Sequence, residues 1–126
     1  VPIIIQAESS GNPYASDGKS FGLMGISECV YEDWVRFQKD EMGKQPHQIP
    51  PFNKIKYEKA WNIEVGNWYL CQIQNWLPEE YKNSRPHIIA AWNWGIGNLR
   101  KNNWQIPKNF KNHKNFIYRK IFRGEL

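Results

Sequence analysis

Residues 3–13 carry an apolar run into a single carboxylate and then into a turn, reading Ile3-Ile4-Ile5-Gln6-Ala7-Glu8-Ser9-Ser10-Gly11-Asn12-Pro13. The pattern predicts a helix from Ile3 to Ser9 with Gly11 as its C-cap, because Pro13 prevents the helix from continuing. Ile4 and Ile5 share the helix face of Glu8, and no Lys or Arg lies at helical spacing from it. A carboxyl group against an apolar wall is expected to have a raised pKa, which suits a general acid. The alternative is a solvated Glu at a helix end.

The composition predicts a globular chain with an anionic or sugar-like partner. Its 126 residues make up one domain's worth of chain, with 40% hydrophobic and 23% charged residues. Seven Trp and six Tyr favour a groove that grips flat, partly polar groups such as sugars. The net charge of +5 indicates a cell-wall polymer, a nucleic acid or an acidic membrane surface as partner.

The two cysteines and the chain ends carry little information on compartment. Cys29 and Cys71 are too few for a disulfide framework, and we expect two buried free thiols, with a single bridge as the alternative. No apolar run has the length of a membrane span, so no integral membrane segment is expected. The sequence shows no signal peptide, and we expect Val1 to begin within a helix. We therefore expect one domain over residues 1–126 that is either cut from a longer precursor or a mature fragment.

Helical periodicity dominates the rest of the chain, and strand signals are weak, so the fold is predicted to be mainly α. The expected elements are a loop or short hairpin over Asn12–Ile26, a helix over Glu28–Met42, an extended connection over Lys44–Asn53, a helix over Lys56–Leu77, a helix over Ser84–Trp94 with Ser84 as N-cap, a short helix over Leu99–Trp104 and a closing helix over Phe110–Phe122. Two apolar stripes on Lys56–Leu77 make it the expected central core helix.

Several other chemistries are disfavoured by spacing. The three histidines, His47, His87 and His113, have no metal-ligand spacing, so we expect no metal site. The Gly95–Asn98 stretch is too short for a phosphate loop, and the basic tail from Lys101 to Arg123 is most simply a solvated face. Four carboxylates could partner Glu8, and the sequence does not place any of them across a cleft from it: Asp17, Glu28, Asp33 and Glu64.

Four ordered blocks resemble the soluble lytic transglycosylase (SLT) domain, a family of the lysozyme superfold close to goose-type lysozyme. The blocks are Glu8-Ser9-Ser10-Gly11-Asn12-Pro13, Gly22-Leu23-Met24-Gly25-Ile26, Asn62-Ile63-Glu64-Val65-Gly66-Asn67-Trp68-Tyr69-Leu70 and Ala90-Ala91-Trp92-Asn93-Trp94-Gly95-Ile96-Gly97-Asn98. Ile106-Pro107 followed by Tyr118 also resembles the closing element of the family, with a longer spacer here. The similarity covers nearly the whole chain in the right order.

The resemblance implies an α+β lysozyme-like fold, a single helical domain with a small loop or hairpin beside a substrate cleft. It implies an enzyme that cuts the MurNAc–GlcNAc β-1,4 bond of peptidoglycan glycan strands and forms 1,6-anhydromuramyl products without a cofactor or metal. We expect it to act as a monomer in the cell envelope, periplasmic, secreted or phage-associated, with no nucleic-acid partner.

Carried over residue by residue, the resemblance makes Glu8 the catalytic acid/base. The substrate-binding positions that it implies are Ser9, Ser16, Met24, Trp92, Asn93 and Tyr118. Trp92 follows Ile88 by four residues, so we expect it on the inner face of its helix, contacting sugar or packing against Glu8. Its alternative role is plain core packing.

Three positions depart from the family pattern and bear on substrate preference and rate. Gly25 stands where the family usually has Gln, Trp92 stands where it usually has Tyr, and Lys114 stands where some members have Glu. One carboxyl suffices if the 2-acetamido group of the substrate supplies the nucleophile. The alternatives are a goose-type hydrolytic lysozyme with a second carboxylate, an inactive peptidoglycan-binding module, and a basic nucleic-acid binder.

Overall fold

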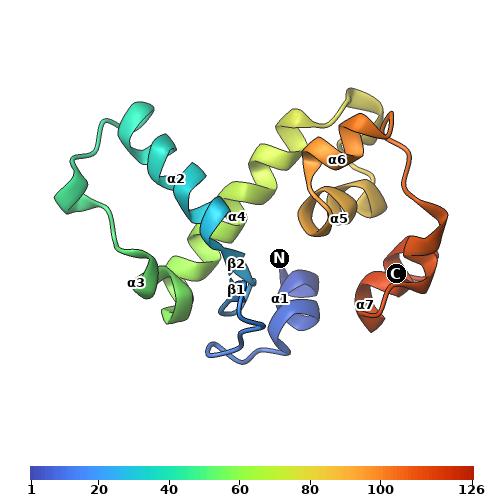
Figure 1. The fold of residues 1–126 in the computed structure, drawn as a ribbon, viewed down its shortest axis with the longest axis horizontal. Helices are drawn as coiled ribbons and strands as arrows, with labels where there is room; N and C mark the ends of the chain where they lie inside the picture. Colours follow the sequence, from blue (N-terminus) through green and yellow to red (C-terminus); the bar gives the residue numbers. More distant parts are fainter. The chain divides into compact units, whose positions relative to one another are not determined.

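The structure is a computed structural model that describes all residues from Val1 to Leu126. It contains seven α-helices, three short 3-10 helices and one two-stranded antiparallel sheet (Figure 1), which confirms the mainly helical fold with a small hairpin. The chain divides into two compact units, Val1–Tyr69 and Leu70–Leu126, which are described separately below. The prediction of one domain over residues 1–126 stays a prediction.

The first unit holds the hairpin and the N-terminal helices. Its elements are α1 (Pro2–Ser9), β1 (Ser20–Phe21), β2 (Ile26–Ser27), α2 (Glu28–Asp40), the 3-10 helix η1 (Pro46–Gln48), α3 (Phe52–Tyr57) and the part of α4 (Lys59–Trp76) up to Tyr69. Ser20 pairs with Ser27 and Phe21 with Ile26 across the hairpin. Trp34, Ile55 and Val65 are at most 2% exposed, so α2, α3 and α4 each contribute to the buried apolar interior.

The end of α1 is fixed by its own side chains. The left-handed turn begins at Ser10, one residue before the predicted C-cap Gly11, with φ angles of 52° and 84° at the two residues. The Ser9 hydroxyl donates to the Ile5 carbonyl oxygen at 2.9 Å and accepts from the Gly11 N–H at 3.2 Å. This closure leaves Glu8 in the last turn of the helix, beside the hairpin.

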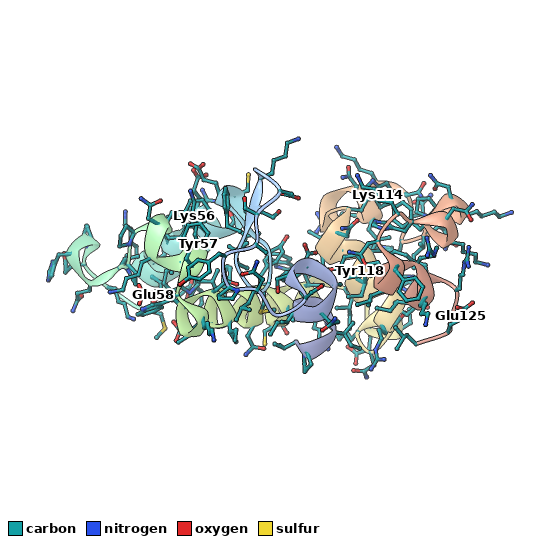
Figure 2. All side chains as sticks on the ribbon, turned by 90° about the horizontal axis from the view of Figure 1, so that it is seen from below. Lys56, Tyr57, Glu58, Lys114, Tyr118 and Glu125 are labelled. Atoms are coloured by element: carbon teal, nitrogen blue, oxygen red, sulfur yellow. The ribbon has the colours of Figure 1, made fainter.

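The predicted helix over Lys56–Leu77 is wrong at its beginning, because the chain breaks between α3 and α4 at Glu58, whose φ and ψ are −85° and 118°. Figure 2 labels Lys56, Tyr57 and Glu58 at this break. Fully buried Asn62 compensates for it, since its amide donates to the carbonyl oxygens of Ile55 at 2.9 Å and Lys56 at 3.3 Å. A side chain thus satisfies acceptors that a continuous helix would have paired internally.

The helix α2 begins and ends close to its predicted positions. Ser27 is the N-cap, and its hydroxyl accepts from the Val30 N–H at 3.3 Å. The helix ends at Asp40, inside the predicted range of Glu28–Met42. The segment predicted as an extended connection, Lys44–Asn53, contains η1 and the first residues of α3, so it is only partly extended.

The second unit holds the remainder of α4, the 3-10 helix η2 (Glu79–Tyr81), α5 (Arg85–Asn93), α6 (Ile96–Lys101), the 3-10 helix η3 (Lys108–Asn112) and α7 (Phe116–Phe122). Ser84 caps α5 as predicted, and its hydroxyl accepts from the His87 N–H. The helix predicted over Leu99–Trp104 begins earlier, at Ile96, because Gly95 takes a φ of 109° and starts a new helix directly after α5.

The closing helix is shorter than the predicted Phe110–Phe122. Asn115 caps α7, since its side-chain oxygen accepts from the N–H groups of Ile117 at 3.1 Å and Tyr118 at 3.2 Å. Both cysteines are free, but Cys29 and Cys71 are exposed, so the expectation of buried thiols is wrong. None of the helices combines the length and the apolar character that a membrane crossing requires.

Candidate active site

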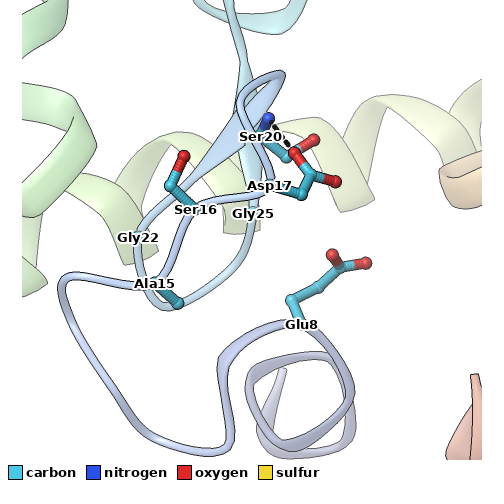
Figure 3. Close-up of a pocket in the computed structure, with 7 residues that line it drawn as sticks. All are labelled: Glu8, Ala15, Ser16, Asp17, Ser20, Gly22 and Gly25. Carbon is cyan, nitrogen blue, oxygen red and sulfur yellow. Dashed lines mark hydrogen bonds between the residues drawn. The ribbon is translucent and has the colours of Figure 1, made fainter.

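A pocket of about 140 Å³ lies between α1 and the hairpin loop of the first unit (Figure 3). It is lined by Glu8, Ala15, Ser16, Asp17, Ser20, Gly22 and Gly25. Glu8 comes from the last turn of α1 and is partly exposed. The structure therefore brings the predicted acid and the predicted Ser16 into one pocket, and both belong to the same compact unit.

Asp17 brings a second carboxyl group to this pocket. Its Oδ1 accepts from the N–H groups of Lys19 at 2.9 Å and Ser20 at 2.7 Å, and these backbone donors hold the pKa of Asp17 below its usual range. Figure 3 shows the Asp17 and Glu8 carboxyl groups in the space between loop and helix. An ionised carboxylate thus shares the pocket of the predicted acid.

The other candidate partners of Glu8 lie outside this pocket. Glu28 begins α2, Asp33 forms an ion pair with Arg36 on α2, and exposed Glu64 lies on α4. Sequence reasoning left all four carboxylates equivalent. The sequence predicts a loop or hairpin over Asn12–Ile26, but spacing alone does not reveal which carboxylate faces Glu8 in the folded chain.

Ser16 is held at the pocket by a local turn. Its hydroxyl oxygen accepts from the Gly18 N–H at 3.0 Å, and its backbone forms an isolated antiparallel bridge with Phe21. The hydroxyl keeps its own proton for donation, because the bond to Gly18 uses it only as an acceptor. Ser16 therefore offers a donor at the pocket wall, and its contact with sugar stays a prediction.

Gly25 allows Glu8 to lie against the hairpin. A Cβ atom at position 25 would lie 2.7 Å from Glu8 Oε1 and 3.0 Å from its carboxyl carbon, so the Glu8 carboxyl group would have to move to another position. Gly25 also has a φ of 66°, in the left-handed region that favours glycine. The departure from the family's Gln at this position is therefore coupled to the place that the Glu8 carboxyl group occupies.

Met24 and Ser9 lie close in sequence to the pocket residues Gly25 and Glu8 but do not line the pocket themselves. Met24 is fully buried, and its N–H donates to Asn62 Oδ1 at 2.8 Å. A Cβ atom on Gly66 of α4 would collide with the Met24 sulfur, so this glycine makes room for the methionine. Ser9 is occupied in closing α1. Direct sugar contacts of Met24 and Ser9 stay predictions.

The remaining predicted site residues belong to the second unit. Trp92 is partly exposed and Asn93 is exposed at the C-terminal end of α5, whereas Tyr118 on α7, labelled in Figure 2, lies in the buried interior. Their contacts with substrate, and the expected proximity of Trp92 to Glu8, stay predictions.

His113 orients Asn93. The sequence predicted only that the histidines lie at the surface or behind the site residues, and it did not pair His113 with Asn93. The Asn115 N–H donates to His113 Nδ1 at 2.9 Å, so His113 Nε2 carries the proton and donates to Asn93 Oδ1 at 3.0 Å. The Asn93 amide nitrogen is thereby left as the group available to a ligand. Burial, together with nearby Lys114, lowers the pKa of His113 and favours this neutral state.

Comparison with known proteins identifies the class to which this fold and pocket belong. Residues 1–117 match the Transglycosylase SLT domain, so the chain belongs to this family. It is 31% identical over 100 residues to the membrane-bound lytic murein transglycosylase C proteins of Shigella sonnei and Yersinia enterocolitica. It is 32% identical over 99 residues to the protein of the same name from Klebsiella pneumoniae.

These alignments cover 76% of this chain but 26% of each relative, so the chain spans about a quarter of the length of the curated relatives it matches. No solved structure matches the chain.

Proposed function

We propose that this chain is a peptidoglycan lytic transglycosylase that cuts the MurNAc–GlcNAc β-1,4 bond, with Glu8 as its general acid and base. The observation that carries the proposal is the position of Glu8, which the family resemblance selects as the acid and which lines a pocket beside the hairpin loop. The names of the matching relatives contain both murein and membrane-bound. From the word murein we infer a peptidoglycan substrate for this chain, and from the word membrane-bound we infer a location in the cell envelope.

The proposed reaction needs only one protonated carboxyl group. Glu8 donates its proton to the glycosidic oxygen while the 2-acetamido oxygen of the muramyl residue attacks the anomeric carbon and the glycosidic bond breaks. The Glu8 carboxylate then takes the proton of the muramyl 6-hydroxyl, whose oxygen displaces the acetamido oxygen and closes the anhydro ring. No water is consumed, and Glu8 ends the cycle protonated, as it began.

We propose roles in substrate binding for the residues around Glu8 and for those of the second unit. Ser16 presents a hydroxyl donor that suits a sugar oxygen or the acetamido carbonyl, and Gly25 leaves the Glu8 carboxyl group room against the hairpin. We assign Asn93 and Trp92 to sugar binding, with the amide nitrogen of Asn93 as donor. Tyr118, Met24 and Ser9 complete the proposed substrate-binding set as buried residues that shape the site.

Asp17 favours a second candidate function, hydrolysis in the manner of goose-type lysozyme. An ionised carboxylate in the same pocket as a general acid can hold and activate a water molecule. The Asp17 carboxylate would accept a proton from that water, and the product would then carry a reducing end. The two reactions use the same acid and differ in whether water is added.

Replacement of the acid tests the assignment of Glu8. Glu8→Gln removes the proton donor at nearly constant size, so we expect peptidoglycan cleavage to fall by ~10²–10⁴-fold while the melting temperature stays near that of the parent. Glu64→Gln is the matched control, because it makes the same chemical change at an exposed position of α4 outside the pocket lining. Turbidity clearing of purified peptidoglycan measures both. Equal clearing by Glu8→Gln and the parent would show that Glu8 is not the acid.

A further inference from the structure

A second pocket, of about 450 Å³, lies in the first unit beside the hairpin. Its lining includes Lys19, Phe21, Glu28, Cys29, Phe52 and Lys56. Successive residues of a strand face opposite sides, and on β1 Ser20 lines the Glu8 pocket whereas Phe21 lines the second one. The two pockets are therefore separated by the hairpin itself.

Lys56 lines this second pocket together with Glu28 but forms no ion pair there. Its ammonium lies 4.2 Å from the Phe21 ring centroid and 4.9 Å from the Phe52 ring centroid. No carboxylate lies within ion-pair distance of it, whereas Lys54, two residues earlier on α3, lies 3.8 Å from Glu58. A partly buried ammonium held over aromatic rings and unmatched by a carboxylate is suited to receive an anionic group.

The pocket's charges and walls together narrow the class of ligand. Lys19 and Lys56 supply two positive charges against the one negative charge of Glu28, which leaves a single net positive charge. The aromatic rings of Phe21 and Phe52 offer apolar surface beside that charge. A doubly charged phosphate would be repelled by Glu28 and would gain nothing from the rings, whereas a peptide carboxylate with an apolar side chain matches both features.

We propose that this pocket binds a carboxylate-bearing peptide, with Lys56 as the central cation and the two Phe rings as its walls. The identification of this peptide as the stem of a peptidoglycan strand rests on the proposed function, because the strand would then occupy the Glu8 pocket on the other side of the hairpin. The pocket then sets stem preference, favouring strands whose stems end in a free carboxylate over amidated or stem-free strands.

The test is a calorimetric titration with the dipeptide N-acetyl-alanyl-alanine, whose single carboxylate and apolar side chains match the pocket. It contains no glycosidic bond and needs no catalysis. We expect Lys56→Gln to weaken its binding roughly ten-fold or more, since one charge-assisted contact is lost. Lys54→Gln, the same change on the same helix outside the pocket, should bind like the parent. Lys19→Gln on the exposed hairpin is a second variant that does not depend on α3, and it should also weaken binding.

Equal weakening by Lys54→Gln and Lys56→Gln would overturn the proposal, as would tighter binding of inorganic phosphate, unchanged binding of the fully amidated dipeptide, or the absence of binding. The outcome is separate from that of the proposed function. If the parent protein binds the dipeptide through Lys56 but cleaves no glycan, the peptide-binding pocket stands and the transglycosylase proposal fails. If it cleaves glycan but does not bind the dipeptide, the transglycosylase proposal stands and the peptide-binding pocket fails.

Discussion

Gly25 and Glu8 share a space that only one side chain can occupy. Any Cβ at position 25 would come within 2.7 Å of Glu8 Oε1, so the glycine determines where the proposed acid lies. Restoring the Gln that is usual in the family would therefore displace Glu8 from its place in this chain. The sequence shows the departure but not the close approach, since the approach depends on how the hairpin returns to α1.

Gly25→Ala is predicted to lower cleavage at least ten-fold with a modest loss of stability, because displacement of a catalytic group by about 1 Å can cost ~10²-fold in rate. Gly18→Ala is the matched control: its φ of 88° imposes similar backbone strain, but nothing lies within 4 Å of its Cβ position. Cleavage rates and melting curves of both variants provide the measurement. Comparable activity of the two variants would contradict the positioning role of Gly25.

Glu8 and Ser16 were predicted as site residues from the family resemblance. Both line one pocket in the structure, and their roles in the reaction stay predictions. Asp17 could be listed but not placed, since its arrival in that pocket depends on a loop conformation held by bonds to Lys19 and Ser20. His113 was missed because its partner Asn93 lies twenty residues away in sequence. The position of Asp17 and the bond between His113 and Asn93 both depend on the folded structure, so the sequence alone could not predict them.

At the scale of secondary-structure elements, Asn62 joins α3, α4 and the hairpin. Its side chain bonds to the Met24 N–H and to the carbonyl oxygens of Phe21, Ile55 and Lys56. The periodicity of residues 56–77 predicted one helix, and it could not reveal the break at Glu58 because no Gly or Pro marks it. The beginning of α5 was predicted correctly from its cap Ser84, whereas the beginning of α7 at its cap Asn115 and the break at Glu58 were not predicted.

Asn62→Ala is predicted to destabilise the protein by about 3 kcal/mol or more, because it leaves several buried backbone groups without partners. Asn67→Ala, an exposed change on the same helix, should alter stability by less than about 0.5 kcal/mol. Chemical denaturation followed by circular dichroism gives both free energies of unfolding. A loss below about 1 kcal/mol for Asn62→Ala would show that this junction is not held by its amide.

Two histidines give the second unit a pH dependence. Burial lowers the pKa of His87, which bonds to Ser84 and the Trp104 carbonyl oxygen, and burial with Lys114 lowers that of His113. Both pKa values then lie lower in the folded chain than in the unfolded chain. As pH falls, the unfolded chain takes up protons first, so the stabilisation present above about pH 6.5 is lost below it.

The melting temperature is therefore predicted to fall between about pH 7.5 and pH 5.5, and the fall should be smaller in a His87→Gln/His113→Gln double variant. His47→Gln serves as the control, since His47 is exposed on η1 and makes no side-chain hydrogen bond. Thermal unfolding at the two pH values measures the slopes. An undiminished slope in the double variant would assign the dependence to other groups.

At the scale of the whole molecule, helical periodicity and the order of the motifs predicted the fold class and the family, but not the division into two compact units. The mainly helical class followed from periodicity, and membership of the SLT family followed from ordered blocks that the comparison over residues 1–117 bears out. The division into two compact units had no signal in the sequence, because it falls inside α4 between Tyr69 and Leu70. A continuous helix carries no linker composition that would mark such a boundary.

The most direct test of the proposed function is the mass of the fragments that the parent protein releases from purified peptidoglycan. In the proposed reaction Glu8 exchanges protons only with the substrate, and no water is added. The muramyl ends should therefore be closed as 1,6-anhydro rings, which are lighter by one water than the corresponding reducing ends. Mass spectrometry of the digest, with Glu8→Gln as the blank, should show these anhydro fragments as the main products. Fragments with reducing ends alone would contradict the transglycosylase account and assign hydrolysis to the pocket that Glu8 shares with Asp17.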